Sequence, residues 1–81
     1  MTIGKILGFT AHYGSGVAHI ELEVEGVRCV VACENAPTVR ALNAIYPCVN
    51  GHSVLVNELI GKFIWFELND FGMLGSISEE I

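Results

Sequence analysis

Positively charged residues are scarce in this sequence. Its 81 residues include 4 Lys and Arg against 9 Asp and Glu, which gives a formal net charge of −5 at pH 7. Proteins that bind nucleic acid usually carry a basic patch, so this balance disfavours nucleic acid as a partner. Charged residues of either sign make up only 16% of the chain and hydrophobic residues make up 52%, which excludes a disordered chain.

Long hydrophobic runs are also absent. No stretch reaches the roughly 20 apolar residues that a membrane-spanning helix needs, so no membrane contact is expected. The first five residues begin no basic stretch followed by a long apolar run, so the sequence predicts no signal peptide and a cytoplasmic location. A chain of 81 residues is predicted to form one small domain over residues 1–81.

The cysteine count does not fit a disulfide framework. There are 3 cysteines, Cys29, Cys33 and Cys48, and an odd number without a signal peptide disfavours structural disulfides. If Cys29 and Cys33 lie on one strand, about 13 Å separates them. Two thiolates at that spacing cannot share a zinc ion, whose bonds to sulfur are about 2.3 Å long. Both are predicted to be buried core cysteines.

Alternation of apolar and polar residues predicts most of the chain to be strands. It is clearest in residues 17–25, where Ile20 and Leu22 alternate with His19 and Glu21. The first strand contains two glycines, which often mark a bulge or a bend. The predicted strands span residues 3–12, 17–25, 27–34, 62–68 and 73–79, with a further short strand considered at 54–56.

The period changes after residue 34. Val39, Leu42, Ile45 and Tyr46 fall on one helical face, which predicts a short amphipathic helix over residues 36–46. Just before it, Asn35 is a suitable helix cap, and Pro37 is suited to the first turn.

The predicted fold is therefore mainly β, with three strands, one helix and two further strands. Consecutive apolar strands favour closure into a small closed or partly open antiparallel barrel. This order resembles that of the oligonucleotide-binding (OB) barrel, and an SH3-like barrel is the alternative.

Two turns predict the strand register. Gly14-Ser15 and Glu25-Gly26 are the turn signals. The first predicts Phe9 opposite Ile20, with Leu7 on the core face and Ile6 on the outer face. The second predicts opposed pairs, Leu22 with Cys29 and Glu23 with Arg28. The final hairpin, through Asn69–Gly72, predicts Trp65 near Ser76 and Lys62 opposite Glu79.

Aromatic residues are the best candidates for a functional surface. Phe63 and Trp65 alternate with Ile64 and Phe66, so both faces of this strand carry large apolar side chains. Together with Phe71 in the following turn, Phe63 and Trp65 are predicted to contact a protein partner. For a nucleic-acid partner, the candidate residues are Trp65 for stacking and the cations Arg28, Arg40 and Lys62.

A weaker alternative is a divalent-metal site. His12, His19 and Glu21 are predicted to share the outer face of the first hairpin, with His52 as a further ligand. The simpler interpretation is that they are exposed polar residues near turns, so no metal and no other cofactor is expected. No serine lies in a G-x-S-x-G context and no phosphate-binding loop is present, so the chain is not predicted to be an enzyme.

These observations favour a small interaction or assembly module. Its partner is another protein or a second copy of the chain, and self-association is left open. A single-stranded nucleic-acid-binding OB-like protein is the first alternative, and a metal-binding protein is the second.

Overall fold

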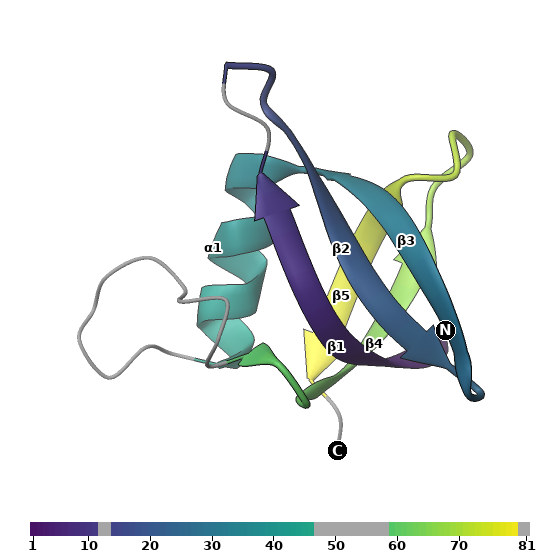
Figure 1. The fold of residues 1–81 in the computed structure, drawn as a ribbon. Coiled ribbons are helices and arrows are strands. Elements are labelled where there is room, and N and C mark those ends of the chain that lie inside the picture. The colour runs from purple at the N-terminus through teal and green to yellow at the C-terminus, as the bar shows by residue number, and fades with distance from the viewer. Residues whose placement is uncertain (12–13, 47–58, 80–81) are drawn as a thin grey trace.

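One antiparallel sheet and one helix make up the computed structural model, which describes residues 1–11, 14–46 and 59–79. The sheet has five strands in the order β3-β2-β1-β4-β5, and α1 follows β3 in the chain (Figure 1). The elements are β1 (Thr2–Ala11), β2 (Val17–Val24), β3 (Val27–Glu34), α1 (Asn35–Ile45), β4 (Phe63–Leu68) and β5 (Leu74–Glu79). The predicted mainly β class and the succession of elements are confirmed. The short strand considered at 54–56 lies outside the described residues.

The sheet is curved but not closed. Strands β3 and β5 approach each other as β4 and β5 curve behind the front of the sheet in Figure 1. No pairing joins β3 to β5 within the described part of the chain, so these two strands are the edges of the sheet. Closure into a barrel is therefore not found, and the OB-like and SH3-like orders stay predictions.

The β2–β3 hairpin has the predicted turn and register. Glu25 and Gly26 both have positive φ, 51° and 79°, as a two-residue turn that matches the strand twist requires. Glu23 lies opposite Arg28 and Leu22 lies opposite Cys29, both as predicted.

A β-bulge in β1 changes which residues face the core. Phe9 lies opposite Ile20 as predicted, but Ile6 pairs with Leu22, and the register shifts between Ile6 and Gly8. Leu7 is the extra residue of this bulge, so the two parts of β1 differ in phase. As a result, Ile6 is fully buried, and the prediction that Leu7 faces the core and Ile6 the outside is wrong.

The helix begins one residue earlier than predicted. Its N-cap is Glu34, which makes no side-chain capping hydrogen bond, and Asn35 is the first helical residue rather than the cap. The Asn35 backbone N–H donates instead to the Gly16 carbonyl at 2.9 Å, which ties the helix start to the β1–β2 turn. Thr38 and Leu42 are the buried residues of α1.

The register of the β4–β5 hairpin differs from the prediction by two residues. Trp65 lies opposite Ser78, and Ile64 lies opposite Glu79, so the predicted neighbours Trp65–Ser76 and Lys62–Glu79 are wrong. The turn is longer than predicted, since the Asn69 N–H donates to the Met73 carbonyl at 2.7 Å. From Ile64 to Glu67 this shift keeps each side chain of β4 on its predicted face. At Leu68 the register shifts again, so that Leu68 lies opposite Leu74 and Leu74 packs against the core.

The core lies on the concave side of the sheet. Gly4 allows the Phe66 ring to cross β1, because a Cβ at this position would lie 3.0 Å from Phe66 Cε1. The buried cluster consists of Ile6, Ile20, Leu22, Val31, Leu42, Leu59, Ile64 and Phe66.

Among the described residues, no helix has the length and apolar character to cross a bilayer.

The bulge can be tested by truncating its two apolar residues separately. Ile6→Ala removes a fully buried side chain, so we expect the free energy of unfolding to fall by about 2–5 kcal/mol. Leu7→Ala removes a half-buried side chain at the extra position and is expected to cost only about 1 kcal/mol. Urea denaturation followed by circular dichroism measures both, and a larger loss for Leu7→Ala would contradict the bulge.

Candidate interaction surface

The outward face of β4 carries two of the predicted contact residues. Ile64 and Phe66 point into the core, with 0% and 6% exposure. Phe63 and Trp65 alternate with them and lie on the opposite face, where Phe63 is 40% exposed and Trp65 is half-buried. The predicted separation of β4 into a core face and an outer aromatic face is therefore found.

Trp65 belongs to a strip of apolar side chains that crosses strands. Ile3 on β1 lies directly opposite Trp65, and Ser78 lies opposite it on β5. The Ser78 hydroxyl donates to Met1 Sδ at 3.8 Å, which brings Met1 to the same region. Neither Ile3 nor Trp65 belongs to the core cluster or to the half-buried residues packed against it. We call Met1, Ile3, Phe63 and Trp65 the outer patch.

Charges of opposite sign lie at the two ends of the outer patch. Lys5 is the cross-strand partner of Phe63 at one end. Glu67 lies two residues beyond Trp65 at the other end, opposite Ser76. Among the residues that the structure describes, neither Lys5 nor Glu67 forms an ion pair.

Phe71, the third predicted contact residue, lies in the loop after β4. The Asn69 side-chain oxygen accepts hydrogen bonds from the Phe71 N–H at 2.9 Å and the Met73 N–H at 3.1 Å. This arrangement holds the loop and leaves Phe71 88% exposed. The length of β4, about 16 Å between Phe63 and Leu68, separates Phe63 from this loop, so the three aromatics do not form one cluster.

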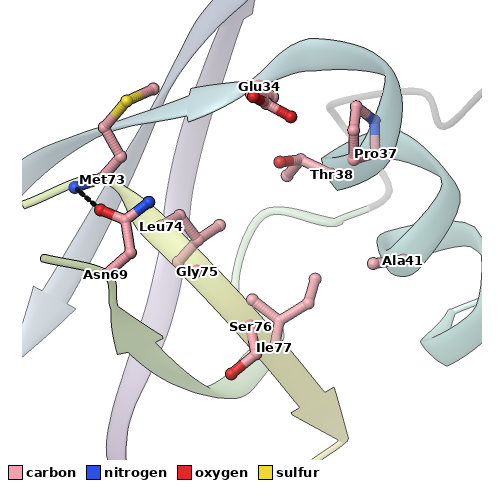
Figure 2. A pocket seen from close by; sticks show the side chains of 10 residues that line it. All are labelled: Glu34, Pro37, Thr38, Ala41, Asn69, Met73, Leu74, Gly75, Ser76 and Ile77. Carbon is pink, nitrogen blue, oxygen red and sulfur yellow. Dashed lines mark hydrogen bonds between the residues drawn. The ribbon is translucent and has the colours of Figure 1, made fainter. Parts of the chain in front are cut away.

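The cavity between α1 and β5 has a volume of about 410 Å³. In Figure 2, the side chains of Glu34 and Thr38 border it on the helix side, and the Asn69 side chain reaches toward Met73. The Asn69 oxygen is occupied by the loop N–H groups, and Thr38 is hydrogen-bonded to Cys33. The Asn69 and Thr38 side chains therefore support the fold, whereas the polar groups of a ligand site are directed at the ligand.

The Cys33 thiol, which is hydrogen-bonded to Thr38 beside this cavity, is not a reactive nucleophile. Burial raises the pKa of its thiol, and this effect outweighs the opposing hydrogen bond with Thr38. A buried thiol with a raised pKa is a poor nucleophile. The predicted core position of Cys33 is confirmed, whereas Cys29 is half-buried.

A second hollow of about 620 Å³ lies between β3 and β4. Val30, Leu68 and Met1 are among the residues that line it, and the exposed fractions of Val30 and Leu68 are 58% and 50%. Its lining mixes polar and apolar groups and includes the core residues Val31 and Phe66, so it does not extend the apolar strip beside Trp65.

The candidate nucleic-acid residues lie on separate elements. Arg28 on β3 forms an ion pair with Glu21, and the Lys62 ammonium lies 5.6 Å from the centroid of the Tyr46 ring. Arg40 is exposed on α1. Two of the three cations thus have intramolecular partners, and Trp65 lies on a different strand from Arg28.

The candidate metal residues are only partly described. His12 and His52 lie outside the described residues, and His19 on β2 lies opposite Thr10 and Ala32. The Glu21 carboxylate accepts a hydrogen bond from Arg28. Within residues 1–11, 14–46 and 59–79, no group of three His, Cys, Asp or Glu residues has the arrangement to hold a metal ion.

Met1 and Ile3 are the members of the outer patch that the sequence pattern did not indicate. Their place beside Trp65 depends on the pairing of β1 with β4, which joins segments about 60 residues apart in the chain. No turn chemistry signals such a pairing.

No protein-family model matches the chain, and no curated protein or solved structure matches it.

The Phe71 loop yields a stability prediction. Asn69→Ala removes the acceptor of two backbone N–H groups, so we expect a loss of about 1–2 kcal/mol in the free energy of unfolding. Asn69→Asp retains an acceptor oxygen and is expected to remain close to the wild type. Phe71→Ser is the matched control, because an 88% exposed ring contributes little to the fold. Thermal and urea unfolding measure all three, and an Asn69→Ala variant as stable as the wild type would refute this account of the loop.

Proposed function

We propose that this protein is an interaction module that binds another protein surface through the outer patch. The observation that carries the proposal is the apolar strip formed across β1 and β4 on the face away from the core. Single exposed apolar residues are ordinary on protein surfaces. Adjacent Trp, Phe, Ile and Met side chains at one place are the composition of a contact surface.

The aromatic residues give this strip its binding capacity. A Trp or Phe side chain removes about 150–250 Å² from water when it is fully covered. Phe63 and Trp65 already lie in fixed positions on a strand, so little conformational entropy is lost when a partner covers them. The Asn69 and Thr38 side chains at the α1–β5 cavity are already hydrogen-bonded within the chain, which favours a binding role over a catalytic one.

We further propose that the curved sheet is a partly open barrel of OB-like order. The approach of β3 to β5 and the position of the helix between the third and fourth strands support this assignment. An SH3-like order is less favoured, because a full helix separates those strands here.

Single-stranded nucleic-acid binding is the second candidate function. It is favoured by Phe71, because the loop between the fourth and fifth strands contributes to the ligand site in OB barrels. The acidic net charge of −5 opposes it.

A photoreactive residue can test the interaction module directly. We expect a benzophenone amino acid at Ser78, beside Trp65, to give a discrete cross-linked product in the native host. The same group at Ala44, exposed on α1, is the matched control and should give none. The product from Ser78 should also disappear in a Trp65→Ala background. If Ser78 and Ala44 gave the same products, or neither gave any, the outer patch would not be a contact surface.

The interaction module and the nucleic-acid alternative predict different results with a single-stranded oligonucleotide. We expect a labelled single-stranded oligonucleotide to show no saturable binding at micromolar protein and low salt, and no quenching of Trp65 fluorescence. The reason is that only 4 Lys and Arg stand against 9 acidic residues. Saturable binding that weakens with salt and requires Phe71 would favour the nucleic-acid function instead.

A further inference from the structure

The charges beside the outer patch are arranged in a way that suits a twofold axis. Phe63 and Glu67 are four residues apart on β4, about 13 Å along the strand. Lys5 lies level with Phe63, and the Ile3–Trp65 pair lies midway between Lys5 and Glu67. The strip itself thus runs from Lys5 through an apolar middle to Glu67, and Glu23 on β2 lies beside Lys5 as its other cross-strand partner.

We propose that the partner of the outer patch is a second copy of this chain. The two copies pack face to face about a twofold axis that lies between the two sheets, over the Ile3–Trp65 pair. The proposal rests on the function proposed above and names the partner. If this axis lies in the plane of the interface and at right angles to the line from Lys5 to Glu67, the rotation brings Lys5 of each copy against Glu67 of the other. Trp65 then lies against the apolar middle of the second copy.

Symmetry makes the order of charges informative. A twofold interface uses the same surface on both subunits, so its charges must be complementary under that rotation. The outer patch meets this condition with two ion pairs, and neither Lys5 nor Glu67 has an ion-pair partner among the described residues of its own chain. A foreign partner imposes no such relation between the two ends.

The packing geometry is ordinary for two sheets. Stacked sheets lie about 10 Å apart, with strands crossing at about 30°. Side chains of the size of Trp65, Phe63 and Met1 fill such a space. The β3 edge, where Val27 and Val30 are exposed, is the other apolar surface that two copies could share, so the experiment must separate the two modes.

Charge reversal tests the inference. We expect sedimentation equilibrium to give twice the chain mass of 8.8 kDa for the wild type. Lys5→Glu and Glu67→Lys should each weaken the dimer at least about tenfold, because each places like charges together. The double variant, Lys5→Glu with Glu67→Lys, should regain most of the lost affinity. Arg40→Glu is the matched control for charge and Val30→Lys for the β3 edge, and both should leave the dimer unchanged.

Each contrary result has a distinct meaning. A wild-type chain that remains monomeric at several hundred micromolar overturns the inference, and the proposed function still stands if cross-linking from Ser78 yields a different protein. A monomer with no cross-link overturns both. A dimer that Val30→Lys dissociates, or that the double variant fails to restore, does not use the outer patch in this way. Circular dichroism melting of every variant separates lost folding from lost association.

Discussion

The structure depends on how β1 divides its backbone pairing. Residues Thr2 to Lys5 pair with β4, and Lys5 to Ala11 pair with β2. The bulge at Leu7 lies two residues after Lys5, where the pairing of β1 changes from β4 to β2. It sets the phase that turns Gly4 and Ile6 inward and leaves Ile3 and Lys5 outward. Without this phase there would be neither the core beneath Phe66 nor the outer patch beside Trp65.

Local chemistry explains which parts of the fold could be predicted from the sequence. The β2–β3 register was predictable because Glu25-Gly26 specifies a two-residue turn, and the neighbouring pairs follow from it. The β4–β5 register was not, because the Asn69 side chain accepts hydrogen bonds from two N–H groups of the loop and so helps to fix a longer turn. The phase of β1 was also missed, since alternation alone does not place the extra residue of a bulge.

The candidate surface was predictable in one strand and not in the other. Phe63 and Trp65 alternate with Ile64 and Phe66, so the sequence alone showed that large apolar side chains must face away from the core, whichever face of the strand is buried. Ile3 gave no such signal, because its role depends on a partner strand more than 50 residues later in the chain. The opposite charges of Lys5 and Glu67 become meaningful only once β1 and β4 are paired.

A strand that is apolar on both faces usually lies between two layers. In β4 the inner layer is provided by the core, where Ile64 is fully buried. On the outer face, Phe63 remains 40% exposed beside half-buried Trp65. A cross-strand pair such as Ile3–Trp65 adds only about 0.2–1 kcal/mol to a sheet, and polar β-formers such as Thr also suit an exposed face. The pairing of Trp65 with Ile3 is bounded by Lys5 and Glu67, neither of which forms an ion pair within the described part of the chain, and this arrangement supports the proposed contact with another surface.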